Sequence, residues 1–153
     1  MKTKLKPILT TFTLFILLAS CALRPIPSEH NLIKIEKAEV STSDLGFGKI
    51  LIYNDANILH TSDNTSRLNI KIDNKNLGQL RAKDFAIINL ENGSHIFNIR
   101  HIDVVNMRSE HEINVTDSTK VIRIKPTITS NKLEIVNQLP ENWDKYRYMN
   151  PNY

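Results

Sequence analysis

The chain has 153 residues and a formal net charge of +4, and it contains a single cysteine. This length suits one small domain with short flanking segments, and one cysteine excludes an intramolecular disulfide. Three of the 20 Lys and Arg residues lie within residues 2–6, and without them 17 basic side chains stand against 16 acidic ones. The basic excess therefore gives no reason to expect binding to nucleic acid or to anionic lipid.

The first segment has the three parts of a secretory signal. Lys2, Lys4 and Lys6 precede a short apolar run from Ile8 to Ala19, which is shorter than the roughly 20 residues that a membrane-spanning helix needs. The run ends at Leu18, Ala19, Ser20 and Cys21, which resemble the lipobox of a bacterial lipoprotein. We expect residues 1–20 to be a signal peptide that is removed and Cys21 to carry diacylglycerol and usually an N-linked fatty acid such as palmitate.

Lipid on Cys21 would make the membrane the first partner of this chain. A cysteine with two or more acyl chains is held stably in a bilayer, and its thiol is no longer available as a nucleophile or metal ligand. Ala22 stands where an inner-membrane retention signal has Asp, so we expect an outer-membrane lipoprotein that faces the periplasm. An ordinary cleaved signal or an uncleaved anchor is the alternative.

Residues 21–48 are interpreted as the lipidated cysteine and a tether. Pro25 and Pro27 favour extended backbone directly after Cys21. Residues 30–40 fit either a strand or one to two helical turns, and residues 41–48 form a loop with two glycines.

Residues 49–139 have the period of two that is typical of strands. Ile50 and Ile52 alternate with their neighbours as in a half-buried strand. In residues 67–73, Leu68, Ile70 and Ile72 form one apolar face, and residues 73–76 form a turn before a short strand at 77–80.

Asn92-Gly93 lies between β-rich runs at 84–90 and 94–103, and this dipeptide predicts a hairpin. Further strands are expected at 110–115, 120–125 and 133–135, with a turn at 116–118 and a strand end or edge at Pro126. The pattern predicts a mainly β fold: an antiparallel β-sandwich of about seven strands over residues 49–139.

The order of these pieces resembles the small bacterial lipoproteins of the domain of unknown function 2846 family, which are similar to transthyretin-like and PEGA-like sandwich modules. The resemblance covers residues 49–101 and rests on the following positions: Ile52, Tyr53, Ile70, Ile72, Asp73, Asn74, Gly78, Leu80, Asp84, Phe85, Gly93 and His95. That family has no established catalytic residues, so the resemblance implies a sandwich fold and no particular reaction.

Histidines are the first candidates for a metal site. His95 and His101 share a strand face, but six positions separate them by about 20 Å, and His111 is expected across a hairpin near Val104. We therefore expect half-buried or surface histidines, with no metal and no cofactor.

Catalytic patterns are also missing from the sequence. Glu110 and Glu112 lie about 7 Å apart on one strand face, and we interpret them as a solvated edge. Gly46 and Gly48 lack the lysine and the following helix of a phosphate loop. No nucleophile elbow or triad pattern occurs, so we expect the chain not to be an enzyme.

Residues 140–153 form an aromatic tail with Trp143, Tyr146, Tyr148 and Tyr153. Such side chains can dock a partner or stack on a sugar. The alternative is a short helix after Pro140 that folds Trp143 and Tyr146 onto the open face of the sandwich.

The sequence therefore predicts a lipid-anchored envelope protein whose sandwich is a non-catalytic binding or scaffolding module, with another envelope protein as the expected partner. The alternative is a small-ligand, glycan or peptidoglycan binder that uses the C-terminal aromatic side chains.

Overall fold

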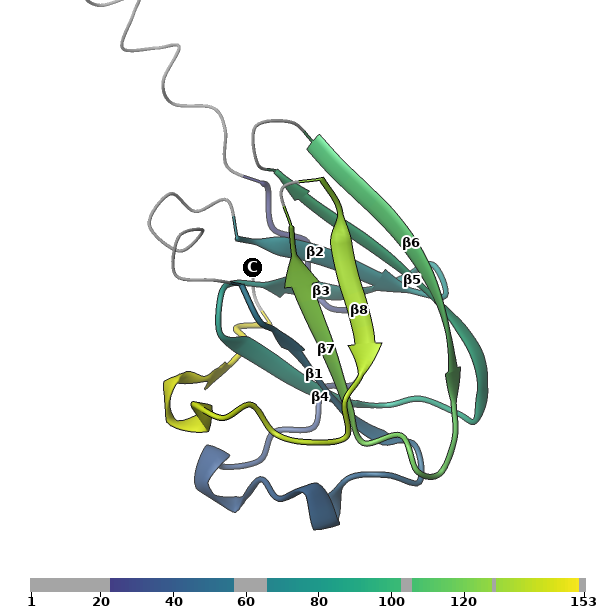
Figure 1. Cartoon of the computed structure of the whole chain (residues 1–153), viewed down its shortest axis with the longest axis vertical. Coiled ribbons are helices and arrows are strands. Elements are labelled where there is room, and N and C mark those ends of the chain that lie inside the picture. The colour runs from purple at the N-terminus through teal and green to yellow at the C-terminus, as the bar shows by residue number, and fades with distance from the viewer. Residues whose placement is uncertain (1–22, 57–65, 103–105, 128, 152–153) are drawn as a thin grey trace, which may run out of the picture.

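The computed structural model describes residues 23–56, 66–102, 106–127 and 129–151, which form two β-sheets (Figure 1). Sheet A has the strand order β8-β7-β1-β4-β9, with β1 at Lys49–Asn54, β4 at Asp84–Asn89, β7 at Val121–Pro126, β8 at Asn131–Ile135 and β9 at Arg147–Tyr148. Sheet B has the order β3-β2-β5-β6, with β2 at Leu68–Ile72, β3 at Lys75–Leu80, β5 at Gly93–Ile102 and β6 at Asn106–Val115. Among the described residues, three single-turn 3-10 helices lie outside the sheets: η1 at Lys37–Glu39, η2 at Thr42–Asp44 and η4 at Trp143–Lys145.

The predicted β-sandwich is confirmed. Its core lies between the sheets and takes side chains from both, including Ile50, Ile52, Leu68, Ile70, Ile72, Leu80, Ile88, Phe97, Ile99, Ile122 and Ile124. Burying each such side chain contributes about 1.5–3 kcal/mol relative to leaving it in water, so this layer is the main source of stability. Sheet A is not purely antiparallel, because β1 pairs with β7 and β4 pairs with β9 in parallel.

The outer face of sheet A is buried as well. Every residue of β1 after Lys49 is buried, and β4 is buried from Asp84 to Ile88. A second apolar cluster covers this face and contains Val40, Leu45, Leu51, Tyr53, Phe85, Ile87, Val121 and Tyr146. The prediction of a half-buried first strand is therefore wrong, because the segments before β1 and after β8 lie across the face that was expected to meet water.

The N-terminal segment at 23–48 belongs to the folded domain. Leu23 is 5% exposed, and its carbonyl accepts a hydrogen bond from Gln79 Nε2 at 3.1 Å. The next carbonyl, of Arg24, accepts one from Asn69 Nδ2 at 2.7 Å. The prediction of a tether is thus wrong for residues 23–48, because an extended segment presents carbonyls that side-chain amides of sheet B can bind. Cys21 itself lies outside the described residues.

The predicted hairpin at Asn92-Gly93 does not form. β4 lies in sheet A, where β1 pairs with one edge and β9 and the Ile33 amide bind parts of the other, and β5 lies in sheet B. Only Gly93 of the two has positive φ, at 136°, whereas a type I′ turn needs it at both. The turn instead carries the chain from one sheet to the other, and Asn92 Nδ2 donates to Asp117 Oδ1 at 2.7 Å.

Other predicted turns and strands are confirmed. Asp73 and Asn74 both adopt positive φ, 49° and 68°, as a type I′ turn between β2 and β3 requires. β7 ends at Pro126, and β8 follows as its antiparallel partner. Within the described ranges, no helix has the length and apolar character to cross a membrane.

Candidate functional site

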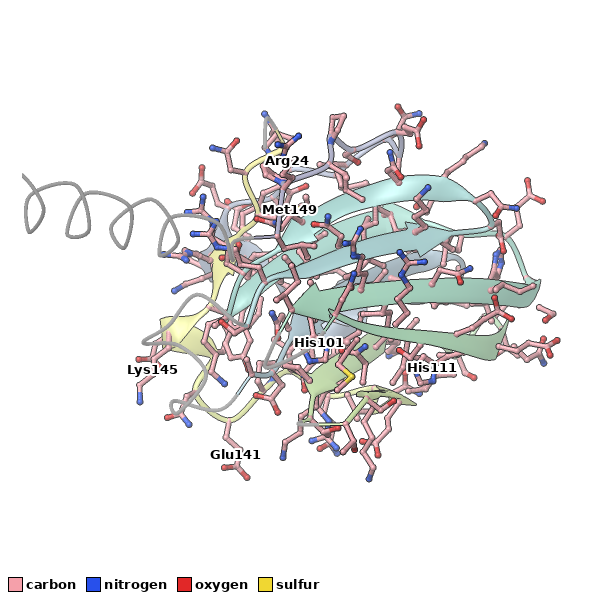
Figure 2. The ribbon with its side chains drawn as sticks, turned by 90° about the horizontal axis from the view of Figure 1, so that it is seen from above. Arg24, His101, His111, Glu141, Lys145 and Met149 are labelled. Atoms are coloured by element: carbon pink, nitrogen blue, oxygen red, sulfur yellow. The ribbon has the colours of Figure 1, made fainter. Side chains whose placement is uncertain are left out.

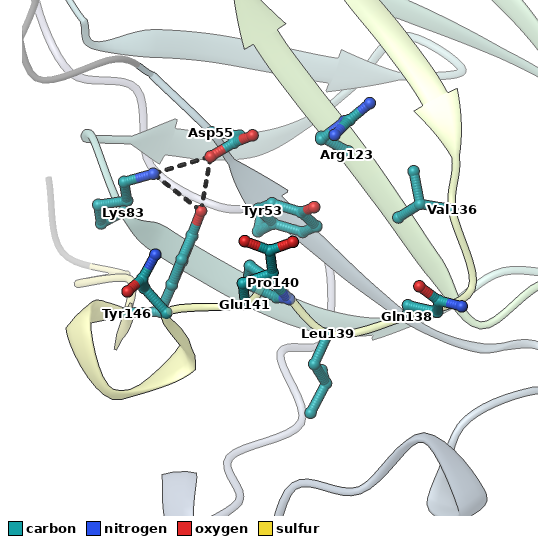
Figure 3. Close-up of a pocket in the computed structure, with 11 residues that line it drawn as sticks. Tyr53, Asp55, Lys83, Arg123, Val136, Gln138, Leu139, Pro140, Glu141 and Tyr146 are labelled. Atoms are coloured by element: carbon teal, nitrogen blue, oxygen red, sulfur yellow. Dashed lines mark hydrogen bonds and ion pairs between the residues drawn. The ribbon is translucent and has the colours of Figure 1, made fainter.

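A pocket of about 550 Å³ opens on the outer side of sheet A, beside the carboxyl-terminal end of β1 (Figure 3). This volume lies within the range of about 300–1,000 Å³ that is usual for ligand pockets. The walls come from β1, the β3–β4 turn, β7 and the chain after β8: Tyr53, Asp55, Lys83, Arg123, Val136, Gln138, Leu139, Pro140, Glu141, Asn142 and Tyr146.

Asp55 is positioned by the parallel pairing of β1 with β7. Its amide donates to the Ile124 carbonyl at 2.8 Å, which continues the ladder beyond the last residue of β1. Asn54, which precedes it, is fully buried, and its Nδ2 donates to the Leu80 carbonyl at 3.1 Å. These bonds fix the direction in which Asp55 leaves the strand.

Lys83 is positioned by an unusual backbone conformation in the β3–β4 turn. Its φ is 62°, in the left-handed region that a lysine rarely adopts. Its amide donates to the Asn54 carbonyl at 3.1 Å, and its carbonyl accepts from the Arg147 amide at 3.0 Å. The turn is therefore held on one side by β1 and on the other by β9.

Three side chains from distant parts of the chain form a hydrogen-bonded triangle in the pocket (Figure 3). Lys83 Nζ lies 2.8 Å from Asp55 Oδ1 and donates to the Tyr146 hydroxyl at 3.1 Å. The Tyr146 hydroxyl donates to Asp55 Oδ1 at 2.8 Å. Burial, together with the hydrogen bond to Asp55, raises the pKa of Tyr146 well above its usual range.

Arg123 and Tyr53 line the pocket beside this triangle. Arg123 forms an ion pair with Glu134 on β8, and this hydrogen bond raises the pKa of the guanidinium further. Burial and the nearby Asp55 carboxylate raise the pKa of Tyr53 to about 12. Both tyrosines are therefore neutral near pH 7, and each of the two cations has a carboxylate partner.

The C-terminal aromatic tail packs on sheet A. The Trp143 ring lies 4.6 Å from the Phe85 ring and stacks on Tyr146 at 5.8 Å. Tyr146 is 2% exposed, and Tyr148 contacts Phe85 edge-on at 5.4 Å. The interpretation that the tail folds onto the sandwich is confirmed for Trp143 and Tyr146. Tyr153 lies outside the described residues.

The candidate histidines lie apart. His101 is buried, whereas His95 is bound to Asp73 and to the Glu91 carbonyl at the other end of β5. His111 pairs with Phe97 in the β5–β6 register, and Figure 2 shows it separated from His101. Val104, near which His111 was expected, lies outside the described residues. Within the described part of the chain, no group of three or more His, Cys, Asp and Glu side chains could hold a metal ion.

The other residues considered from the sequence lie on an edge strand and in a tight turn. Glu110 and Glu112 are exposed on β6, the edge strand of sheet B, as expected for a solvated edge. Gly46 and Gly48 form a tight turn closed by the Gly46 and Lys49 backbones, and a strand follows it instead of a helix.

Among the charged and aromatic pocket residues that precede the C-terminal tail, sequence reasoning missed four: Tyr53, Asp55, Lys83 and Arg123. They lie on three segments that are distant in sequence, and no motif connects them. The one local signal was the aromatic tail, which contributes Tyr146.

The lipobox residues Leu18 to Cys21 lie outside the described ranges. Comparison with protein-family models, curated proteins and solved structures found no match for this chain.

Proposed function

We propose that this chain is a lipid-anchored protein of the bacterial cell envelope, held through Cys21 at the outer membrane and facing the periplasm. The support is the lipobox at Leu18 to Cys21 after a short apolar run. Resemblance to the domain of unknown function 2846 lipoproteins points the same way and is part of this proposal. Cys21→Ser should leave the chain without lipid, and incorporation of a labelled fatty acid by that variant would contradict the proposal.

The sandwich of this protein acts as a non-catalytic binding module, and the pocket on sheet A is its ligand site. The main support for a ligand site is the pocket of about 550 Å³, in which Asp55, Lys83 and Tyr146 converge. Tyr53 and Arg123 line the same pocket. A few polar groups that converge in a preformed concave site are typical of ligand recognition.

The ligand class follows from the charge pairing. Lys83 is paired with Asp55 and Arg123 with Glu134, so a strongly charged ligand would have to compete with existing pairs. A neutral ligand with many hydroxyl or amide groups needs no such exchange, because the pocket also offers the amides of Gln138 and Asn142. A sugar or polyol is the class that fits.

Recognition would depend on hydrogen bonds and not on stacking against the tail. Trp143 and Tyr146 stack on each other, and Trp143 also packs against Phe85. Their ring faces are thus occupied within the protein, which favours the pocket over an aromatic platform as the site of a glycan.

The tyrosines also argue against proton transfer in the pocket. A general acid or base works best with a pKa near the operating pH. Burial moves the pKa of Tyr53 to about 12 and that of Tyr146 upward as well. Their hydroxyls are therefore suited to hydrogen bonding with a ligand.

Trp143 offers the test, because it is the only tryptophan and stacks on the pocket residue Tyr146. We expect N-acetylglucosamine, glucose or trehalose to change its fluorescence saturably. Gln138→Ala with Asn142→Ala should weaken that response, and Asn114→Ala on sheet B should not. Saturation by inorganic phosphate or putrescine alone would contradict the ligand class, and no response to any probe would contradict the site.

A further inference from the structure

The outer face of sheet B carries a groove rich in basic side chains, away from the polar pocket on sheet A. We call it the basic groove and define it by Ile26, Lys71, Asn98, Arg100, Arg108 and Glu110. Three of these six side chains are cationic and one is anionic. The cationic ones, Lys71, Arg100 and Arg108, are all exposed.

Two arginines lie directly opposite each other in the basic groove. Arg100 on β5 pairs with Arg108 on β6, and Lys71 lies on β2 two positions from the residue that faces Arg100. Like charges directly opposite on neighbouring strands destabilise a sheet. An anionic ligand that lies between them would remove this repulsion.

The basic groove lies next to the point at which the chain leaves for the lipid. Asn69 binds the Arg24 carbonyl at 2.7 Å, and Asn69 is also the direct register partner of Arg100. At a strand spacing of about 4.8 Å, Arg108 is only about 10 Å from Asn69.

The chain between Cys21 and the folded domain is very short. Cys21 precedes Leu23 by two residues, which span at most about 7 Å, and Leu23 is held to Gln79. A lipid on Cys21 would therefore bring this end of sheet B to the membrane surface.

We propose that the basic groove binds the phosphate headgroups of anionic phospholipids in the membrane that holds Cys21, and that it thereby orients sheet B toward the bilayer. This rests on the proposed lipid at Cys21. Lysine and arginine side chains close to an anionic bilayer each favour contact by roughly fivefold. The three long cationic side chains lie on an open sheet face. Such a face is better suited to binding a membrane surface with many charges than to enclosing a single phosphate ion.

The orientation can be measured with one introduced thiol, because lipid blocks the only native cysteine. The lipidated protein with Asn98→Cys carries a fluorophore inside the basic groove. Asp144→Cys, on η4 over the opposite sheet, is the matched control. Each is reconstituted in vesicles of phosphatidylcholine with or without phosphatidylglycerol, together with a headgroup-attached quencher. The intact mass of the protein, recorded beforehand, shows whether Cys21 carries lipid. Absence of lipid on Cys21 is therefore distinguished from failure of the basic groove to bind the membrane.

We expect phosphatidylglycerol to raise quenching at position 98 at least twofold and to leave position 144 unchanged. Combined Lys71→Gln, Arg100→Gln and Arg108→Gln substitutions should abolish the increase, as should 1 M NaCl. Equal quenching on both vesicles, or an increase that survives the triple substitution, would overturn the proposal. A response of the position 98 probe to inorganic phosphate on neutral vesicles would assign the groove to a soluble phosphate instead.

Discussion

Replacing Tyr146 tests whether the C-terminal tail is a structural part of the sandwich. Its side chain is 2% exposed, and its ring lies 5.3 Å from that of Tyr53. Removing a buried aromatic ring typically destabilises a protein by about 3–5 kcal/mol, through lost contacts and the cavity that remains. We expect Tyr146→Ala to lower the free energy of unfolding by about that amount.

Tyr146→Phe keeps the ring and removes only the hydroxyl. This hydroxyl donates to Asp55 at 2.8 Å and accepts from Lys83 at 3.1 Å, and a hydrogen bond to a charged group contributes about 1.5–3 kcal/mol. Asp55 and Lys83 keep each other as partners, and their side chains are 25% and 29% exposed, so water replaces part of what is lost. We therefore expect a smaller loss of about 1–2 kcal/mol.

Tyr148→Phe is the matched control for the hydroxyl. The Tyr148 hydroxyl is buried and has no hydrogen-bond partner among the described residues, so its removal should leave stability unchanged or raise it slightly. Urea unfolding followed by Trp143 fluorescence measures all three variants. A loss below about 1 kcal/mol for Tyr146→Ala, or equal effects of the two Tyr→Phe changes, would refute the packing described here.

Three further predictions concern backbone, pH and the N-terminal segment. Gly48 has φ of +86°, and a Cβ added there would lie 2.7 Å from a backbone carbonyl oxygen. A Cβ added at Gly93, which has φ of +136°, would have no neighbouring atom within 4 Å. In urea unfolding, Gly48→Ala should therefore destabilise the protein by at least about 1 kcal/mol more than Gly93→Ala. Burial raises the pKa of Tyr53 to about 12, whereas a tyrosine in the unfolded chain ionises at about pH 10. The free energy of unfolding should therefore be unaffected by this group below about pH 10 and fall by about 2–3 kcal/mol as the pH rises toward 12. Urea midpoints that stay constant from pH 9 to pH 12 would contradict this. Gln79→Ala removes the donor to the Leu23 carbonyl and should speed amide hydrogen exchange in the segment that follows Leu23, while exchange in β1 stays unchanged.

Local patterns predicted most of the strands and the turn at Asp73-Asn74, because a period of two and left-handed turn residues act within a few positions. Asn92-Gly93 shows where such a signal fails. The dipeptide marks a turn, but it does not decide which strands pair: β4 pairs with β1 and β9 in sheet A, and β5 lies in sheet B.

Burial on the outer face of sheet A could not be predicted from β1 alone. Alternation tells which side chains share a face, but not whether a distant segment covers it. Val40 and Tyr146, which cover that face, lie on either side of the strand-rich region.

The pocket depends on long-range placement in the same way. Asp55 and Tyr146 are 91 positions apart in the chain, and Lys83 reaches them only because its turn adopts a backbone conformation that its residue type does not favour. The aromatic composition of the tail was visible in the sequence, but its contact with Lys83 was not.

We propose that lipid on Cys21 holds this binding module at the membrane. Intact mass spectrometry of the protein purified from bacterial membranes tests it most directly. We predict a chain that begins at Cys21 and carries the added mass of diacylglycerol, with or without a further acyl group. A chain that retains residues 1–20, or one with an unmodified cysteine, would contradict the account.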